Sequence, residues 1–155
     1  AKYQYMSLDM IADEIRIMCI MPAENVTAPI VMHAAHCPVK CEVTFTALSC
    51  ESSHCDIRSP ILTTHLDRWG TDEAPVEIVL NGQKKLIRKN LAEAIRAVRM
   101  PNGIVPLWID AMSINQDDVI ERGRQVARMG AIYENATVII SHVGEQATDT
   151  ALALE

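Results

Sequence analysis

Three residues that could bind a ligand, Asp110, Asn115 and Gln116, follow a short apolar segment in the second half of the chain. The apolar segment, residues 104–109, is typical of a buried strand, and the polar residues 110–118 after it contribute little to packing. In parallel α/β sheets, ligands bind beyond the carboxyl ends of the strands. We therefore expect these side chains to orient a ligand at a strand end. The alternative is that Asp110 only satisfies loop amides.

A second set of possible ligands lies in the first half of the chain, between residues 33 and 65. Its members are His33, His36, Cys37, Cys41, Cys50, His54, Cys55 and His65. Zinc takes four thiolate or imidazole donors in a tetrahedron. The Cys-x3-Cys and Cys-x4-Cys spacings miss the tight Cys-x2-Cys knuckle, so we favour free thiols and loop histidines over a metal site. No metal and no cofactor is predicted.

Alternating helices and strands must position the first set of residues. Helical periodicity predicts a helix that begins at Asn90, as N-cap, and ends before Pro101. Asp118 is expected to cap a second helix that runs to about Asn135, and residues 137–142 are expected to form a strand. This order of elements, with short links, is typical of right-handed crossovers in a parallel sheet.

The first half of the chain is expected to be rich in strands. Residues 15–21 are apolar except at Arg16, and residues 30–33 form a second candidate strand. Residues 41–48 alternate between apolar and polar side chains, which predicts a half-buried strand.

A long irregular segment and a hairpin follow. Residues 49–72 show no sustained period and are expected to form a loop or an insertion. The dipeptide Asn81-Gly82, between residues 76–80 and 85–87, favours a type I′ hairpin turn. Residues 148–155 could begin another helix.

Composition excludes several classes of protein. The 155 residues suit one domain, and 49% hydrophobic and 22% charged residues are ordinary for a globular chain. A net charge of -6 and 4% aromatic residues argue against a nucleic-acid partner. No apolar run approaches the roughly 18 residues of a membrane span. Five cysteines without a secretory signal indicate reduced thiols and a cytoplasmic location.

The segment from Leu107 to Glu145 resembles the central signature of the fungal heterokaryon incompatibility (HET) domain. Residues 107–121 have the sequence LWIDAMSINQDDVIE, and residues 122–145 continue it as RGRQVARMGAIYENATVIISHVGE. Upstream, residues 46–49 (TALS) resemble the family's "ALS" block, which includes Ser49. Residues 79–96 are similar to its hairpin and Asn-Leu-Ala helix. The resemblance covers residues 45–145.

The sequence departs from the family pattern in three places. Ser113 stands where the family usually has cysteine, so a thiol there is not essential. Trp69-Gly70 comes about twenty residues later than the pattern places it, so residues 50–68 are expected to be an insertion or translated intron sequence. His142-Val143 replaces the tryptophan next to the last glycine of the signature.

The resemblance implies an α/β fold of TIR-like (flavodoxin-like) type: a parallel sheet flanked by helices, with a β-rich N-terminal part. It also implies a single HET domain over residues 1–155, from the N-terminal part of a longer protein. The implied function is incompatibility-triggered cell death. Some TIR relatives hydrolyse NAD with one helix-borne glutamate, so Glu121 is the implied catalytic residue and NAD the possible substrate.

In that hypothesis, the Glu121 carboxylate would hold the ribose hydroxyls and stabilise oxocarbenium-like charge. Asp110, Asn115, Gln116 and Ser49 would bind the substrate, and Arg122 could pair with a phosphate. Each has an ordinary structural alternative: Glu121 lies three residues after Asp118 and could complete a capping box, and Arg122 could belong to a solvated helix face.

Two other functions stay open at the level of sequence. The domain could be a non-enzymatic module that associates with itself and with other incompatibility or signalling proteins, using its polar loop as an interface. It could also be an inactive remnant of the family. Self-association is expected in either active case, since a lone site of this kind is often incomplete.

Overall fold

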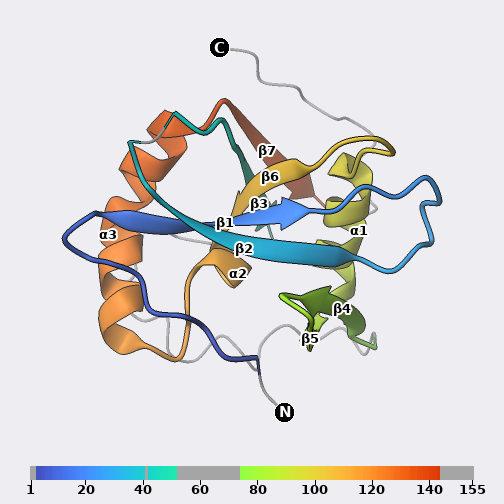
Figure 1. The fold of residues 1–155 in the computed structure, drawn as a ribbon, viewed down its shortest axis with the longest axis horizontal. Helices are drawn as coiled ribbons and strands as arrows, with labels where there is room; N and C mark the ends of the chain where they lie inside the picture. The colour runs from blue at the N-terminus through green and yellow to red at the C-terminus, as the bar shows by residue number, and fades with distance from the viewer. Residues whose placement is uncertain (1–2, 41, 52–73, 144–155) are drawn as a thin grey trace.

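The computed structural model describes residues 3–40, 42–51 and 74–143, which form one seven-stranded sheet and three helices (Figure 1). The strands are β1 (Glu14–Ile20), β2 (Val31–Pro38), β3 (Thr46–Glu51), β4 (Val76–Leu80), β5 (Gln83–Ile87), β6 (Val105–Ile109) and β7 (Val138–Val143). The helices are α1 (Lys89–Val98), α2 (Asp110–Ser113) and α3 (Val119–Asn135). Five strands precede α1, so the β-rich N-terminal part is confirmed.

The sheet is mixed, which corrects the prediction of a parallel sheet. Its order is β5-β4-β2-β1-β6-β3-β7. Strands β6, β3 and β7 are parallel, as the alternation of helices and strands predicts. However, β1 lies in the middle of the sheet and runs antiparallel to both of its neighbours, β2 and β6. The hairpin β4–β5 adds a third antiparallel pair at one edge. The fold is thus α/β with strands in both directions.

Two apolar layers cover the two faces of the sheet. Met18 and Ile20 of β1 pack on the side of α1, together with Leu91 and Ile95. Ile15 and Ile17, of the other parity, pack on the side of α3 with Ile132. Figure 1 shows the two helices separated by the strands. Because side chains alternate along a strand, both faces of β1 are buried, as a central strand requires.

Burial on both faces explains why the alternation in residues 41–48 was misleading. Strand β3 begins at Thr46, and Val43 is exposed. Ala47 and Leu48 are adjacent in sequence and both fully buried. Adjacent residues of a strand point to opposite faces, so both faces of β3 are buried at this point, while β6 and β7 pair with its two edges. The first three residues of the predicted loop, 49–51, also belong to β3; residues 52–73 and 148–155 lie outside the described parts of the chain.

The predicted hairpin turn is confirmed. Asn81 and Gly82 have φ of 50° and 75°, the two positive values that a type I′ turn needs. Asn81 also ties the turn to the rest of the sheet, because its Oδ1 accepts from the Ala34 amide at 3.0 Å.

The helix boundaries are confirmed at one helix and corrected at the other. Asp118 caps α3, as predicted: its side chain accepts from the amides of Ile120 and Glu121. The N-cap of α1 is Arg88 rather than Asn90, whose Oδ1 accepts from the Leu91 amide inside the helix. No described helix is both long and apolar enough to pass through a bilayer.

Replacing Gly82 by alanine should destabilise the domain by about 1–2 kcal/mol, because a Cβ is disfavoured at its φ of +75°. Gly103→Ala is the matched control, since Gly103 lacks a positive φ and a Cβ there would also meet open space. Denaturant unfolding measures both variants. Equal losses of stability would contradict the assignment of the turn.

Candidate functional site

The polar segment after β6 begins with a helical turn, not with a loop. Asp110 follows directly on Ile109 and is the first residue of α2. The turn folds back on the strand, because the Ile109 amide donates to Ser113 Oγ at 3.0 Å. Ser113 is fully buried, so this hydroxyl is a structural hydrogen-bond partner at the end of β6.

Asp110 lies directly after the carboxyl end of β6, and Ser49 lies on the neighbouring parallel strand β3. Leu48 of β3 is paired in register with Ile109 of β6. Ser49 and Asp110 each follow one member of this pair, although β3 continues to Glu51 and pairs with β7 at Ser49. Both side chains are half-buried. The two residues, about sixty positions apart in the sequence, thus lie on or next to neighbouring strands.

Gln116 and Arg122 are held next to Asp110 by a chain of hydrogen bonds. Gln116 Nε2 donates to the Asp110 carbonyl at 3.2 Å, and Arg122 Nη1 donates to the Gln116 carbonyl at 3.1 Å. Asn115 Oδ1 accepts from the Asp117 amide at 3.3 Å. These contacts stabilise the turn between α2 and α3. The Arg122 guanidinium, predicted to pair with a phosphate, thus donates to a backbone carbonyl of the domain itself.

Glu121 is buried and paired with a cation from β1. Its relative exposure is 7%, and that of Arg16 is 1%. Arg16 Nη2 donates to Glu121 Oε2 at 2.9 Å, and Arg16 Nη1 pairs with Oε1. Oε1 also accepts from the Asn115 amide at 2.9 Å. Both carboxylate oxygens are thus engaged, in the two-pronged geometry that favours an arginine–carboxylate pair.

The same guanidinium contacts two further segments of the chain, the end of α2 and the N-terminal segment. Arg16 Nη1 donates to the Ser113 carbonyl at 3.1 Å, and Nη2 donates to the Met6 carbonyl at 2.6 Å. The guanidinium carbon lies 4.9 Å from the centre of the Tyr5 ring. Tyr5 in turn donates to the Met112 carbonyl at 3.0 Å, and burial raises its pKa to about 12.

The capping-box alternative for Glu121 holds only in part. The Glu121 amide donates to the capping side chain of Asp118 at 3.1 Å. The reciprocal bond of a capping box would run from the Asp118 amide to the Glu121 side chain. That amide donates instead to the Asn115 carbonyl at 3.2 Å, and the Glu121 carboxylate turns to Arg16.

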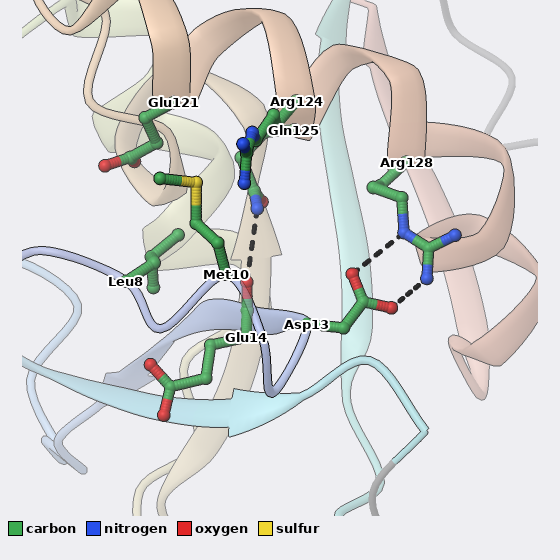
Figure 2. Close-up of a pocket in the computed structure, with 8 residues that line it drawn as sticks. All are labelled: Leu8, Met10, Asp13, Glu14, Glu121, Arg124, Gln125 and Arg128. Atoms are coloured by element: carbon green, nitrogen blue, oxygen red, sulfur yellow. Dashed lines mark hydrogen bonds and ion pairs between the residues drawn. The ribbon is translucent and has the colours of Figure 1, made fainter.

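A small cavity lies beside Glu121, between α3 and the N-terminal segment (Figure 2). It is lined by Leu8, Met10, Asp13, Glu14, Glu121, Arg124, Gln125 and Arg128. At about 40 Å³ it has room for about one water molecule and none for a nucleotide. Figure 2 shows Arg128 of α3 paired with Asp13, and Gln125 Nε2 donates to the Glu14 carbonyl at 3.1 Å.

The buried face of α3 is partly polar. Met129 and Tyr133 pack against the buried cluster that contains Trp108. The most buried positions of the helix are Glu121, Gln125 and Ile132, two of which are polar.

No metal cluster forms within the described residues. Of the eight possible zinc ligands, His33, His36 and Cys37 lie on β2, where His33 points to the opposite face from His36. Cys50 lies on β3, and the remaining four fall outside the described residues.

Arg16 pairs with Glu121 but was not among the predicted site residues. The sequence holds one signal for it: a single charged residue inside the apolar run 15–21. An arginine at the centre of a buried strand requires a buried counter-charge. That requirement predicts a buried carboxylate as the partner of Arg16. The structure shows that this carboxylate is Glu121, which is therefore not free.

Removing the Glu121 charge should destabilise the domain by about 3–5 kcal/mol, because Glu121→Gln leaves the Arg16 cation buried without a counter-ion. The matched control is Glu93→Gln, which breaks the exposed pair between Lys89 and Glu93 and should change stability by less than about 0.5 kcal/mol. Urea unfolding compares them. A double variant, Arg16→Met with Glu121→Gln, should be more stable than Glu121→Gln alone.

Asp110 should destabilise the domain at neutral pH, because burial raises its pKa and the charged form is held in a poorly solvated place. The penalty is present above the folded-state pKa and disappears as the pH falls through it. Asp110→Asn should therefore be more stable than the wild type at pH 7, with a difference that vanishes in acid. Thermal melts across this pH range test it, and an Asn variant less stable at pH 7 would contradict it.

A sequence model of the family described as heterokaryon incompatibility protein (HET) matches residues 64–155, which is more than half of the chain. The match contains α1 to β7, and with them Asp110, Asn115, Gln116, Glu121 and Arg122. No curated protein and no solved structure is matched, and the TIR-like fold therefore stays a prediction. The chain belongs to the heterokaryon incompatibility family, and its function is of the heterokaryon-incompatibility type.

Proposed function

We propose that this domain triggers cell death in incompatibility as a self-associating signalling module, and that Glu121 serves the structure rather than the chemistry. The observation that supports the proposal is the burial of the Glu121 carboxylate against Arg16. Both of its oxygens have donors, and the Asn115 amide adds a third contact.

Freeing Glu121 for a substrate would be costly. Arg16 is 1% exposed, so losing its carboxylate leaves an unpaired cation in the interior, which costs about 3–5 kcal/mol. The adjoining cavity of about 40 Å³ would also have to enlarge before a dinucleotide could enter. These two costs favour a signalling role over Glu121-dependent catalysis.

Exposed apolar side chains supply candidate surfaces for association. Val119 and Ile120, on the first turn of α3, are 69% and 65% exposed. Val138 and Ile139 are about half exposed on β7, the last strand in the sheet order. Apolar patches and sheet edges are places where chains associate.

NAD cleavage is the second candidate, and one observation favours it. Asp110 comes directly after the carboxyl end of β6, where parallel strands bind ligands, and Ser49 follows the residue of β3 that is paired with Ile109. The Asp110 carboxyl accepts only from the Ala111 amide, at 2.7 Å, among the described residues, and its pKa is raised by burial. If the domain hydrolyses NAD, Asp110 is the carboxyl group that is available to the substrate, with Gln116 beside it.

Nicotinamide release by the purified protein separates the two candidates. The signalling proposal expects no turnover at high protein concentration. If turnover occurs and Asp110→Asn abolishes it while a folded Glu121→Gln variant retains it, the second candidate replaces the first. Loss in folded Glu121→Gln alone would restore Glu121 as the catalytic residue.

Expression in host cells, with sedimentation of the purified protein, tests the signalling proposal directly. Ile120→Lys should weaken both self-association and killing, because a charge on the exposed patch opposes its burial between chains. Val26→Lys is the control, since Val26 is 70% exposed but lies in the link between β1 and β2. A wild-type protein that stays monomeric at high concentration and still kills would contradict self-association.

A further inference from the structure

We propose that a second cavity, over β1 and β2 on the side of α1, binds the oxyanion of a small carboxylate or phosphate compound. The cavity has a volume of about 240 Å³ and is lined by Tyr3, Met6, Arg16, Ala34, His36 and Asn81. Apart from Arg16 and Met6, none of these residues takes part in the site described above. The inference is independent of the signalling function.

Four segments of the chain build the cavity: two strands, the N-terminal segment and a hairpin turn. Arg16 and His36 are register partners on β1 and β2, and Ala34 lies two residues before His36 on the same face. Tyr3 and Met6 belong to the N-terminal segment, and Asn81 belongs to the hairpin turn after β4. The paired strands β1 and β2 thus form the floor of the cavity. The residues around it, Tyr3, Met6 and Asn81, are fixed by hydrogen bonds.

Hydrogen-bond donors dominate this cavity. The Tyr3 hydroxyl accepts from Asn81 Nδ2 at 3.0 Å, so its own hydrogen is left to donate. Asn81 Oδ1, which could have accepted, is already bound by the Ala34 amide at 3.0 Å. His36 Nδ1 lies 3.5 Å from a Glu14 carboxylate oxygen, and in the imidazolium form Nε2–H donates as well, so that form is the one that binds an oxyanion.

Arg16 supplies an independent indication of a missing acceptor. Its side chain is 99% buried, and its Nε–H has no acceptor among the residues that the structure describes. A buried donor without a partner destabilises the folded protein, and a bound oxygen would offset that loss. Glu121 lies on the opposite end of the guanidinium and neutralises its charge without satisfying this nitrogen.

Charge and size narrow the class of ligand. Arg16 and His36 each contact a carboxylate, Glu121 and Glu14 respectively, and the Lys85 ammonium, 5.6 Å from the Tyr3 ring, adds a cation beyond these two contacts. A donor-rich site with nearby cations selects oxyanions over cations or apolar molecules. The volume is below the roughly 300–1,000 Å³ of typical cofactor pockets, so it suits a small compound and excludes a dinucleotide.

The test titrates the full chain with inorganic phosphate and, separately, with acetate, while NMR follows the His36 imidazole. Saturable binding with Kd in the millimolar range is expected for at least one of them, and the tighter one identifies the phosphate or the carboxylate source. Tyr3→Phe and His36→Gln should each weaken binding about tenfold, because the first removes a hydroxyl donor and the second removes the imidazolium charge. Because His36→Gln has no imidazole at this position, its binding is followed by the backbone resonances or by the heat of binding.

His33→Gln is the matched control, because His33 is an exposed histidine on the other face of the same strand. It should bind as the wild type does. The proposal is overturned if the folded wild type binds neither ion saturably, if neither Tyr3→Phe nor His36→Gln weakens binding, or if His33→Gln weakens it equally. Melting curves establish that each variant is folded. A negative result leaves the cell-death and sedimentation experiments untouched.

Discussion

The contact between Arg16 and Glu121 is the point at which the separate parts of this domain are joined. Arg16 sits in the central strand β1, and its guanidinium also binds the carbonyls of Met6 and Ser113. Through these bonds the N-terminal segment, the end of α2 and the start of α3 are fixed on one side chain. A charged group in the interior is tolerated only when its donors are matched by acceptors. The turn between α2 and α3 takes its shape from that requirement.

This constraint changes how the polar residues of the family signature can be understood. A signature glutamate at the start of a helix invites a catalytic interpretation, yet here it balances a cation from a segment outside the matched residues. The turn between α2 and α3 is also stabilised by hydrogen bonds from Asn115, Gln116 and Arg122. In the described turn from α2 to α3, Asp110 is a carboxyl group with few partners: it accepts from the Ala111 amide, directly after the end of β6.

Local features of the fold were predicted well from the sequence, whereas the pairing of strands distant in sequence was not. The Asp118 cap and the Asn81-Gly82 turn depend on neighbouring residues, and the structure confirms both. The alternation of helices and strands correctly predicted the parallel β6, β3 and β7. It could not predict that β1 inserts between β2 and β6 in the opposite direction, because no local pattern records which strands become neighbours. For the same reason, the site was predicted as a set of nearby residues, and its distant member Arg16 was missed.

The position of β1 also has a consequence for how the chain reaches its native state. Its pairing with β2 can form as soon as residues 14–38 have been made, but its other edge pairs with Leu107 and must wait until most of the chain has emerged from the ribosome. Until then, a strand with buried residues on both faces has one open side. Contacts this distant in sequence slow folding and leave a nascent chain prone to mispairing with other chains. A protein of this architecture should therefore depend on chaperones early in its synthesis.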